Sequence, residues 1–183
     1  MKPMSQAPTK SETITLAGGC FWCTEAVYER VRGVLSVQSG YSNGHLAHPN
    51  YEQVCSGQTG HAEVVRVRFD PSVVSLRELL EVFFAVHDPT SLNRQGADVG
   101  TQYRSGIYWN TEAQASVARE VIAEAQGAHE EPLVTELLPE RNYFPAEDYH
   151  QQYYARNPEQ GYCAFVVAGK VDKFLASFRR LVK

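Results

Sequence analysis

Alternation of apolar and polar residues predicts β-strands in this chain. The clearest case is His61–Phe69, where Glu63, Val65, Val67 and Phe69 share one face at the period-two spacing of a strand. Shorter stretches rich in Val, Ile, Thr and Tyr predict four more strands, at Thr13–Ala17, Val34–Tyr41, Tyr103–Trp109 and Leu133–Leu138.

Helical spacing and capping residues predict the helices. Ser75 with Glu78, and Thr111 with Gln114, form capping boxes in which each side chain binds the backbone N–H of the other residue. Four helices are expected, between Gly19 and Gly33, from Ser75 to His87, from Thr111 to about Gln126, and within Ala146–Asn157.

The resulting order β-α-β-β-α-β-α-β favours an α+β fold. We expect a two-layer sandwich with a ferredoxin-like split βαβ core, a mixed, largely antiparallel sheet with helices on one side, and an irregular C-terminal segment. The length of 183 residues and the hydrophobic fraction of 43% suit one domain with its own core. Residues 1–12 are expected to be a flexible polar leader, and residues 13–183 a single domain.

Two long connections, Ser42–Gly60 and His87–Gln102, interrupt this pattern. Both are rich in Gly, Asn, Tyr, His and Asp. Loops of this length inside a compact domain usually serve a function, so we expect site residues there.

The charge balance narrows the choice of partners. With 17 Lys and Arg against 21 Asp and Glu, the formal net charge is −4, which argues against nucleic acid or an anionic membrane as the main partner. No apolar run approaches the roughly 20 residues of a membrane-spanning helix, and the first residues lack the apolar stretch of a signal peptide. We expect a cytoplasmic protein, in which disulfides are transient or catalytic.

Candidate chemistry centres on the sequence GGCFWC at residues 18–23. Cys20 is expected where a strand ends and a helix begins, and the backbone N–H groups and helix dipole at such a position lower the pKa of a thiol. Cys20 is therefore a candidate nucleophile, with an inert buried cysteine as the alternative. Phe21 and Trp22 can form an apolar socket for a methyl or thioether group, or can pack in the core.

Glu63 is a candidate proton donor. Its strand face is otherwise apolar, and burial on that face would favour the neutral acid, which can give a proton to a reacting group. The alternative is an exposed glutamate at the start of a strand.

The CxxC pair leaves other functions open. A thiol–disulfide oxidoreductase would use Cys20 and Cys23. A cysteine hydrolase would activate Cys20 through His61 or His150.

A zinc-binding interaction module is a further alternative, and we expect no metal. Cys55 and Cys163 do not form a second close pair of ligands. The histidines of the first long loop are expected to be solvated; they are His45, His48 and His61.

Longer stretches of the sequence resemble a known family. The stretches GGCFWCTEAV, GYSNGHLAHPNYEQVCSGQTGHAEVVRVRFDP, FFAVHDPTSLNRQGADVGTQYRSGIY and AEDYHQQYYARNPEQGYC are similar to the A-type peptide-methionine sulfoxide reductases, from about Thr13 to Cys163. The resemblance implies an α+β catalytic domain with a central mixed sheet. It also implies reduction of the S epimer of methionine sulfoxide, free or in proteins, and hence repair of oxidised proteins.

The resemblance also implies roles for individual residues. Asp98 would orient a water or Tyr103, with a loop-capping aspartate as the alternative. Independently of the resemblance, Cys55 is expected to be structural and His150 to lie on a helix surface, with contact to the redox centre as the alternative for His150. The family motifs assign Cys20 as nucleophile, Phe21 and Trp22 as the methyl-binding socket, Glu63 as acid, Tyr51 and Tyr103 as ligands of the sulfoxide oxygen, and Cys163 as resolving thiol.

One departure from the family pattern concerns recycling. Cys23 stands where many members have Gly, and no cysteine follows Cys163. We expect Cys163 to resolve the oxidised Cys20 through a mobile C-terminal segment, with Cys23 as a backup or later relay. The resemblance further implies thioredoxin as reductant and no cofactor, and we expect a monomer.

Overall fold

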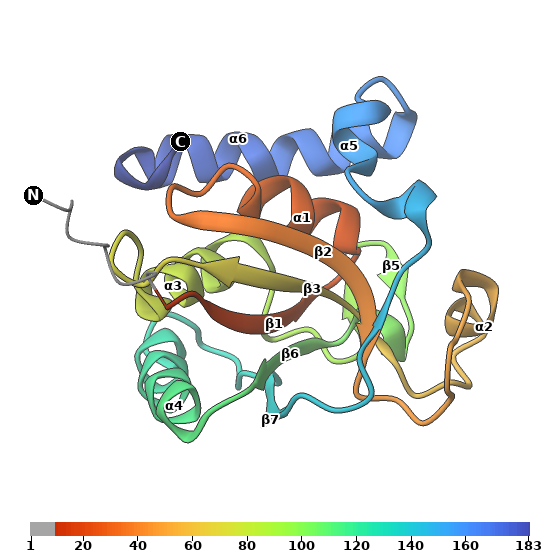
Figure 1. The fold of residues 1–183 in the computed structure, drawn as a ribbon, viewed down its shortest axis with the longest axis horizontal. Coiled ribbons are helices and arrows are strands. Elements are labelled where there is room, and N and C mark those ends of the chain that lie inside the picture. Colours follow the sequence, from red (N-terminus) through yellow and green to blue (C-terminus); the bar gives the residue numbers. More distant parts are fainter. Residues whose placement is uncertain (1–9) are drawn as a thin grey trace, which may run out of the picture.

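The computed structural model describes residues 10–183. A six-stranded sheet has the order β7-β6-β1-β3-β2-β8 (Figure 1). The β6–β7 pair is parallel and the other pairs are antiparallel, which confirms the predicted mixed sheet. The strands are β1 (Glu12–Gly18), β2 (Val34–Ser42), β3 (Ala62–Phe69), β6 (Ser105–Trp109), β7 (Glu136–Pro139) and β8 (Phe144–Pro145).

The helices confirm the α+β class and cover the main core. That core joins the apolar side chains of the central strands to those of α1, α3 and α6, and α4 packs against α3 and β6. A smaller cluster around Tyr108 lies apart from it. The helices are α1 (Phe21–Tyr28), α2 (Tyr51–Cys55), α3 (Leu76–Val86), α4 (Glu112–Gln126), α5 (Tyr153–Arg156) and α6 (Ala168–Ser177).

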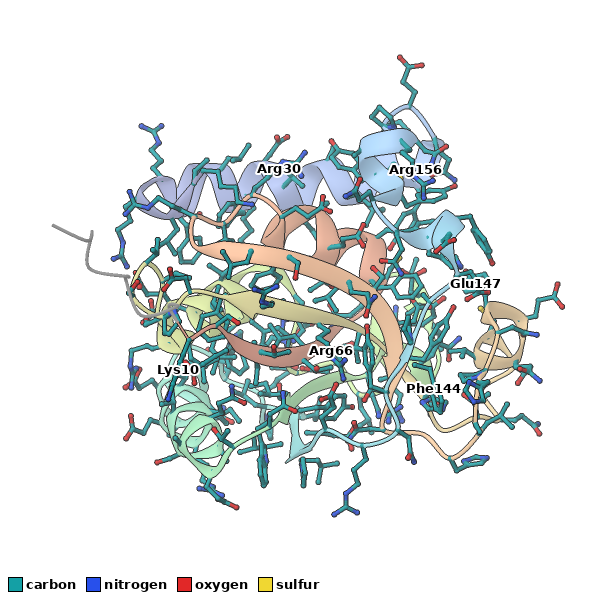
Figure 2. All side chains as sticks on the ribbon, in the orientation of Figure 1. Lys10, Arg30, Arg66, Phe144, Glu147 and Arg156 are labelled. Atoms are coloured by element: carbon teal, nitrogen blue, oxygen red, sulfur yellow. The ribbon has the colours of Figure 1, made fainter. Side chains whose placement is uncertain are left out.

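Polar and charged side chains surround the sheet and helices (Figure 2). Arg66 extends from β3, lies 3.6 Å over the ring of Tyr143 and pairs with Glu140 at 2.6 Å. This stack ties the segment after β7 back to the sheet. Within residues 10–183 no helix combines the length and apolarity needed to cross a membrane.

Three elements differ from their predicted bounds. The strand expected from Tyr103 begins at Ser105, because Tyr103 closes a 3-10 turn. The strand expected from Leu133 begins at Glu136, because Leu133 N–H donates to the Gln126 side chain and Val134 N–H to the Pro89 carbonyl. Helix α1 ends at Tyr28 instead of continuing to Gly33, since the chain turns there before β2.

The C-terminal segment is only partly irregular. After β8 the chain forms short turns and α5, and then a π-helical turn, Cys163–Val167, runs directly into α6. Its buried side chains recur at helical spacing, at Cys163, Val167, Val171 and Phe174. A helix therefore occupies part of the expected irregular segment.

Both long connections contain short elements of their own. The first holds α2, which Asn50 and Gln53 open with a capping box. The second holds the hairpin of β4 (Arg94–Gln95) and β5 (Asp98–Val99), followed by a 3-10 turn at Thr101–Tyr103. Of the expected leader, residues 1–9 lie outside the described residues, and Glu12 already pairs with Phe69 in the sheet.

Candidate active site

Cys20 lies at the junction of β1 and α1, as the sequence predicts. It is the N-cap residue of α1 and is 9% exposed. Gly19 before it has φ +91°, and a Cβ atom there would lie 2.6 Å from Cγ of Gln95. Glycine is thus required for both the backbone conformation and the close approach of the β4–β5 hairpin.

Glu63 is buried beside Cys20, which excludes the exposed alternative. Its side chain is 1% exposed, and its Oε1 accepts the N–H of Phe21 at 3.2 Å. Burial, together with the charges of Asp98 and Cys23, raises the pKa of Glu63 to about 8. Its Oε2 has no hydrogen-bond partner, so the neutral carboxyl group has a free position from which to donate a proton.

The interaction between the Cys20 and Cys23 thiols raises the pKa of Cys20 and lowers the pKa of Cys23. Burial raises the pKa of Cys20 well above its ordinary value, and the bond to Cys23 and the charge of Glu63 add to this. The hydrogen bond from Cys20 lowers the pKa of Cys23 to about 7, with help from Lys170 and Tyr162. The expected low pKa of Cys20 is therefore wrong for the resting protein, because burial outweighs the helix N-terminus.

Tyr162 is a residue of the site that the sequence analysis missed. Its hydroxyl donates to Oδ2 of Asp98 at 2.7 Å and lies 3.8 Å from Sγ of Cys23. The signal was available, since Tyr162 precedes Cys163 in the GYC motif. Asp98 of β5 is in this way tied to the thiol pair.

His150 is the centre of an aromatic cluster. It is 1% exposed, and its Nδ1 accepts the indole N–H of Trp22 at 3.1 Å. Its ring centroid lies 5.0 Å from that of Phe21 and 4.6 Å from that of Tyr51. The prediction that His150 lies on a helix surface is wrong, because aromatic side chains from other parts of the chain pack around its ring and bury it.

Trp22 is held on its other side by Tyr153. The two rings stack with centroids 3.8 Å apart and an interplanar angle of 6°. Phe21 is buried and Trp22 half-buried. One face of the cluster therefore consists of fixed aromatic rings with little freedom to move.

Tyr51 and Tyr103 come from the two long connections. Tyr51 begins α2, where its N–H donates to Glu147 at 3.0 Å, and Tyr103 ends the 3-10 turn. Burial raises the pKa of both phenols, and the charge of Glu63 raises both further. Both hydroxyls are therefore protonated and can donate hydrogen bonds near Glu63.

Cys163 is fully buried in the π-helical turn before α6. Burial and the charge of Cys23 raise its pKa. All four cysteines carry free thiols. Instead of lying on a mobile approach to Cys20, as expected, Cys163 is part of a packed helix with Cys23 as its charged neighbour; Cys55, at the end of α2, is exposed.

His61 is engaged by the backbone of its own loop. Its Nδ1 accepts the N–H of Gly44 at 3.1 Å, and its Nε2 lies 2.7 Å from the carbonyl oxygen of Leu46. The side chain is 1% exposed, so the expectation that it is solvated is wrong. Both ring nitrogens are used, which leaves none to activate Cys20.

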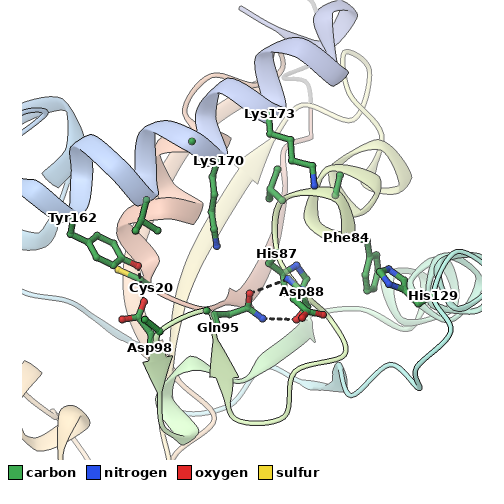
Figure 3. Close-up of a pocket in the computed structure, with 16 residues that line it drawn as sticks. Cys20, Phe84, His87, Asp88, Gln95, Asp98, His129, Tyr162, Lys170 and Lys173 are labelled. Atoms are coloured by element: carbon green, nitrogen blue, oxygen red, sulfur yellow. Dashed lines mark hydrogen bonds between the residues drawn. The ribbon is translucent and has the colours of Figure 1, made fainter.

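A cavity of about 590 Å³ opens beside Cys20 (Figure 3). Its walls are the end of α3, the β4–β5 hairpin and the start of α6. Tyr162 and Asp98 border it next to Cys20, and Lys170 and Lys173 reach into it from α6.

The sequence model of the family described as peptide methionine sulfoxide reductase matches residues 12–181. The chain belongs to the peptide methionine sulfoxide reductase family. A family member from Polynucleobacter asymbioticus, peptide methionine sulfoxide reductase MsrA, is 54% identical over 93% of this chain and 91% of its own.

Solved structures agree with this membership. Reduced Mxr1 from Saccharomyces cerevisiae has a TM-score of 0.79 and 39% identity, over 86% of this chain and 91% of its own. The structure of Mxr1 in complex with Trx2 has a TM-score of 0.56 and 29% identity, over 83% and 91%. As a peptide methionine sulfoxide reductase, the protein is an oxidoreductase, which decides against the hydrolase and the zinc module.

Proposed function

We propose that residues 13–183 form a single catalytic domain that reduces the S epimer of methionine sulfoxide, free or in proteins, with Cys20 as nucleophile and Glu63 as acid. The observation that carries this proposal is the pairing of a buried, proton-bearing carboxyl with a thiol at the start of α1. The aromatic cluster beside the pair suits the methyl group of the substrate.

In the substrate complex, the methyl group would lie against Phe21 and Trp22. The sulfoxide oxygen would then accept hydrogen bonds from Glu63, Tyr51 and Tyr103. The unpartnered Oε2 of Glu63 supports this arrangement, because a buried donor without a partner is costly until a ligand satisfies it.

In the chemical step, the sulfur of Cys20 attacks the sulfoxide sulfur while Glu63 protonates the oxygen. The S–O bond of the substrate breaks, its oxygen leaves as water with the protons of Glu63 and the Cys20 thiol, and the two sulfurs remain joined as a sulfonium. A water then attacks the sulfur of Cys20, the S–S bond breaks, methionine leaves, and Cys20 becomes a sulfenic acid. The proton released by that water returns to Glu63, so overall thiol and sulfoxide become sulfenic acid and thioether. Asp98 contributes by keeping Glu63 protonated and by holding Tyr162.

Two thiols are available to resolve the sulfenic acid, and the sequence favours Cys163. The geometry supports a relay in which Cys23 bonds Cys20 first and Cys163 then bonds Cys23. Cys23 shares a hydrogen bond with Cys20, and its charge acts on Cys163. A direct bond between Cys20 and Cys163 needs their Cα atoms within about 4.4–6.8 Å, and Cys163 is buried in the π-helical turn. Each closure releases water or a thiol.

Thioredoxin is the proposed reductant of the final disulfide. The structure of the relative Mxr1 in complex with Trx2 supports this choice. No cofactor is required, because the electrons arrive through thiols. We further propose a cytoplasmic monomer, since one chain supplies every residue of the site and free thiols persist in a reducing compartment.

The test is an assay driven by dithiothreitol with each epimer of a blocked methionine sulfoxide. We expect turnover of the S epimer and none of the R epimer. Equal turnover of both epimers, or of neither, would refute the proposed specificity.

One observation favours a second candidate, a general thiol–disulfide oxidoreductase. Cys20 and Cys23 form a hydrogen-bonded CxxC pair in which one pKa is about 7. This candidate predicts reduction of protein disulfides at a similar rate in the presence or absence of methionine sulfoxide.

A further inference from the structure

The cavity beside Cys20 is lined on one side by the segment that contacts β6, and Glu63 is not part of its lining. Glu63 comes from β3, which pairs with one edge of β1, whereas β6 pairs with the other edge. His87, which lines the cavity, lies 2.7 Å from the Ser105 hydroxyl of β6. The cavity volume of about 590 Å³ is in the range of small-ligand sites, and Phe21, Trp22 and Glu63 are not among its lining residues.

Two lysines that form no ion pair with another described residue supply positive charge to this cavity. Among residues 10–183 neither Lys170 nor Lys173 forms an ion pair, and both side chains point inward from α6 (Figure 3). The two carboxylates of the lining accept hydrogen bonds from neutral groups of the protein and keep their negative charge. Asp88 accepts the N–H and hydroxyl of Thr90 at 2.9 and 2.6 Å, and Asp98 accepts Tyr162.

The remaining wall is apolar and suits a peptide chain. Phe84 and Val86 from α3 and Val166 from the π-helical turn line it. Lys170 and Lys173 are one helical turn apart, about 4.5 Å along α6, and an extended peptide advances about 3.3 Å per residue. The two lysines are therefore separated by about the length of one to two extended residues.

We propose that this cavity binds the polypeptide on one side of the methionine sulfoxide and selects substrates with an acidic side chain close to it in sequence. The inference rests on the proposed function, in which the methyl group occupies the aromatic cluster beside Cys20. The charge of Lys170 and Lys173 provides the selection, and Phe84, Val86 and Val166 contact the intervening residues.

The test compares synthetic peptides that contain one methionine sulfoxide. Asp is placed two and three positions before it or after it, and matched peptides carry Lys instead. Partly exposed charge pairs predict kcat/KM roughly 3- to 10-fold higher for the better acidic peptide, mainly through KM. The ratio should fall towards one in 0.5 M salt, because salt screens exposed charges.

Lys173→Glu is the decisive variant, since its side chain is exposed and its replacement leaves the core intact. It should reverse the preference in favour of Lys peptides. Arg179→Glu, which makes the same change of charge outside the cavity, should keep the wild-type ratio.

Blocked methionine sulfoxide, which has no flanking residues, separates the two proposals. If the wild type does not reduce it, the proposed function is wrong. If it does, but acidic and basic peptides react equally or Lys173→Glu retains the wild-type preference, the inference is overturned. A loss in Lys173→Glu confined to turnover driven by thioredoxin would also overturn it, because the cavity would then serve the reductant.

Discussion

Glu63 and Cys20 hold the protons on which the proposed chemistry depends. Both groups are buried, and burial favours the neutral form of each. A neutral carboxyl is the form that can protonate a sulfoxide oxygen, whereas a neutral thiol is the less nucleophilic form of cysteine. The substrate must therefore take part in activating Cys20, by accepting the proton that the site holds.

Cys20→Ser should abolish reduction even with excess dithiothreitol. A serine hydroxyl at this position keeps the shape of the site but lacks a comparably nucleophilic atom. Turnover of blocked methionine sulfoxide measures the effect. Cys55→Ser, outside the buried cluster, is the matched control and should retain activity; substantial turnover by Cys20→Ser would remove Cys20 from its role.

Glu63→Gln should slow the chemical step by about 10²–10⁴-fold, the usual contribution of a general acid. The amide still fits the site but gives no proton. In the wild type the single-turnover rate should fall as pH rises past about 8, because Glu63 then ionises. This fall of the rate above about pH 8 should be missing in Glu63→Gln. A single-turnover rate in the variant equal to that of the wild type would contradict the role of Glu63 as general acid.

His150→Phe should raise KM more than it lowers kcat. Phenylalanine keeps a ring in the cluster, but the indole N–H of the half-buried Trp22 loses its acceptor, at a cost of about 0.5–1.5 kcal/mol, the usual net contribution of a hydrogen bond. His150→Asn keeps an acceptor and should restore part of the loss. Tryptophan fluorescence reports whether the indole has moved; if KM and emission stay at wild-type values in His150→Phe, the bond has no positioning role.

At the scale of elements, the site depends on three segments that meet at the end of β1. Helix α1 supplies the thiol pair, the β4–β5 hairpin supplies Asp98, and the π-helical turn before α6 supplies Cys163. π-Helical turns are rare and frequently occur at functional sites. Here the turn holds the buried Cys163.

Disulfide mapping by mass spectrometry after one turnover without reductant tests the relay. Cys163→Ser should stop at a Cys20–Cys23 disulfide and lose recycling by thioredoxin, while Cys23→Ser should accumulate sulfenic acid at Cys20. Cys55→Ser should behave as the wild type. A Cys20–Cys163 disulfide that forms at full rate in Cys23→Ser would favour the direct route instead.

At the scale of the whole molecule, local sequence signals predicted most of the sheet and the capped helices. The alternation in β3 and the capping box at Ser75 are signals of this kind, and both elements form as expected. Helix α6 lacks a capping side chain at its start, because it continues a helical turn, so its beginning gave no signal.

The sequence identified the candidate site residues, but it did not establish their burial, their pKa values or their long-range contacts. Motifs identified Cys20 and Glu63, but the burial that sets their pKa values comes from the assembled core. His150 and Tyr162 contact residues more than 100 positions away in sequence. Such contacts depend on the fold of the whole chain, and local patterns do not reveal them.

The pH dependence of stability is a property of the whole fold. The pKa of Glu63 is raised when folded, so its contribution is fully present below its unfolded pKa and is lost as pH rises towards 8. His87 has the opposite sign: its pKa is lowered to about 4, and its contribution is lost as pH falls below its unfolded value.

Comparison of the wild type with Glu63→Gln isolates the first effect, because His87 is common to both. From pH 5 to pH 8 the stability of Glu63→Gln relative to the wild type should rise by about 3 kcal/mol, at about 1.4 kcal/mol per unit of pKa difference. Urea unfolding at several pH values measures this. A constant difference would mean that Glu63 is not protonated in the folded protein.

The proton retained on Cys20 has a consequence for survival of the protein itself. Hydrogen peroxide oxidises thiolates far faster than thiols, and a catalyst that reverses oxidation damage works where peroxide is abundant. A protonated thiol on a residue that is only 9% exposed is a poor target for that oxidant. Cys20 is therefore expected to react with methionine sulfoxide bound in the site and to react slowly with free hydrogen peroxide.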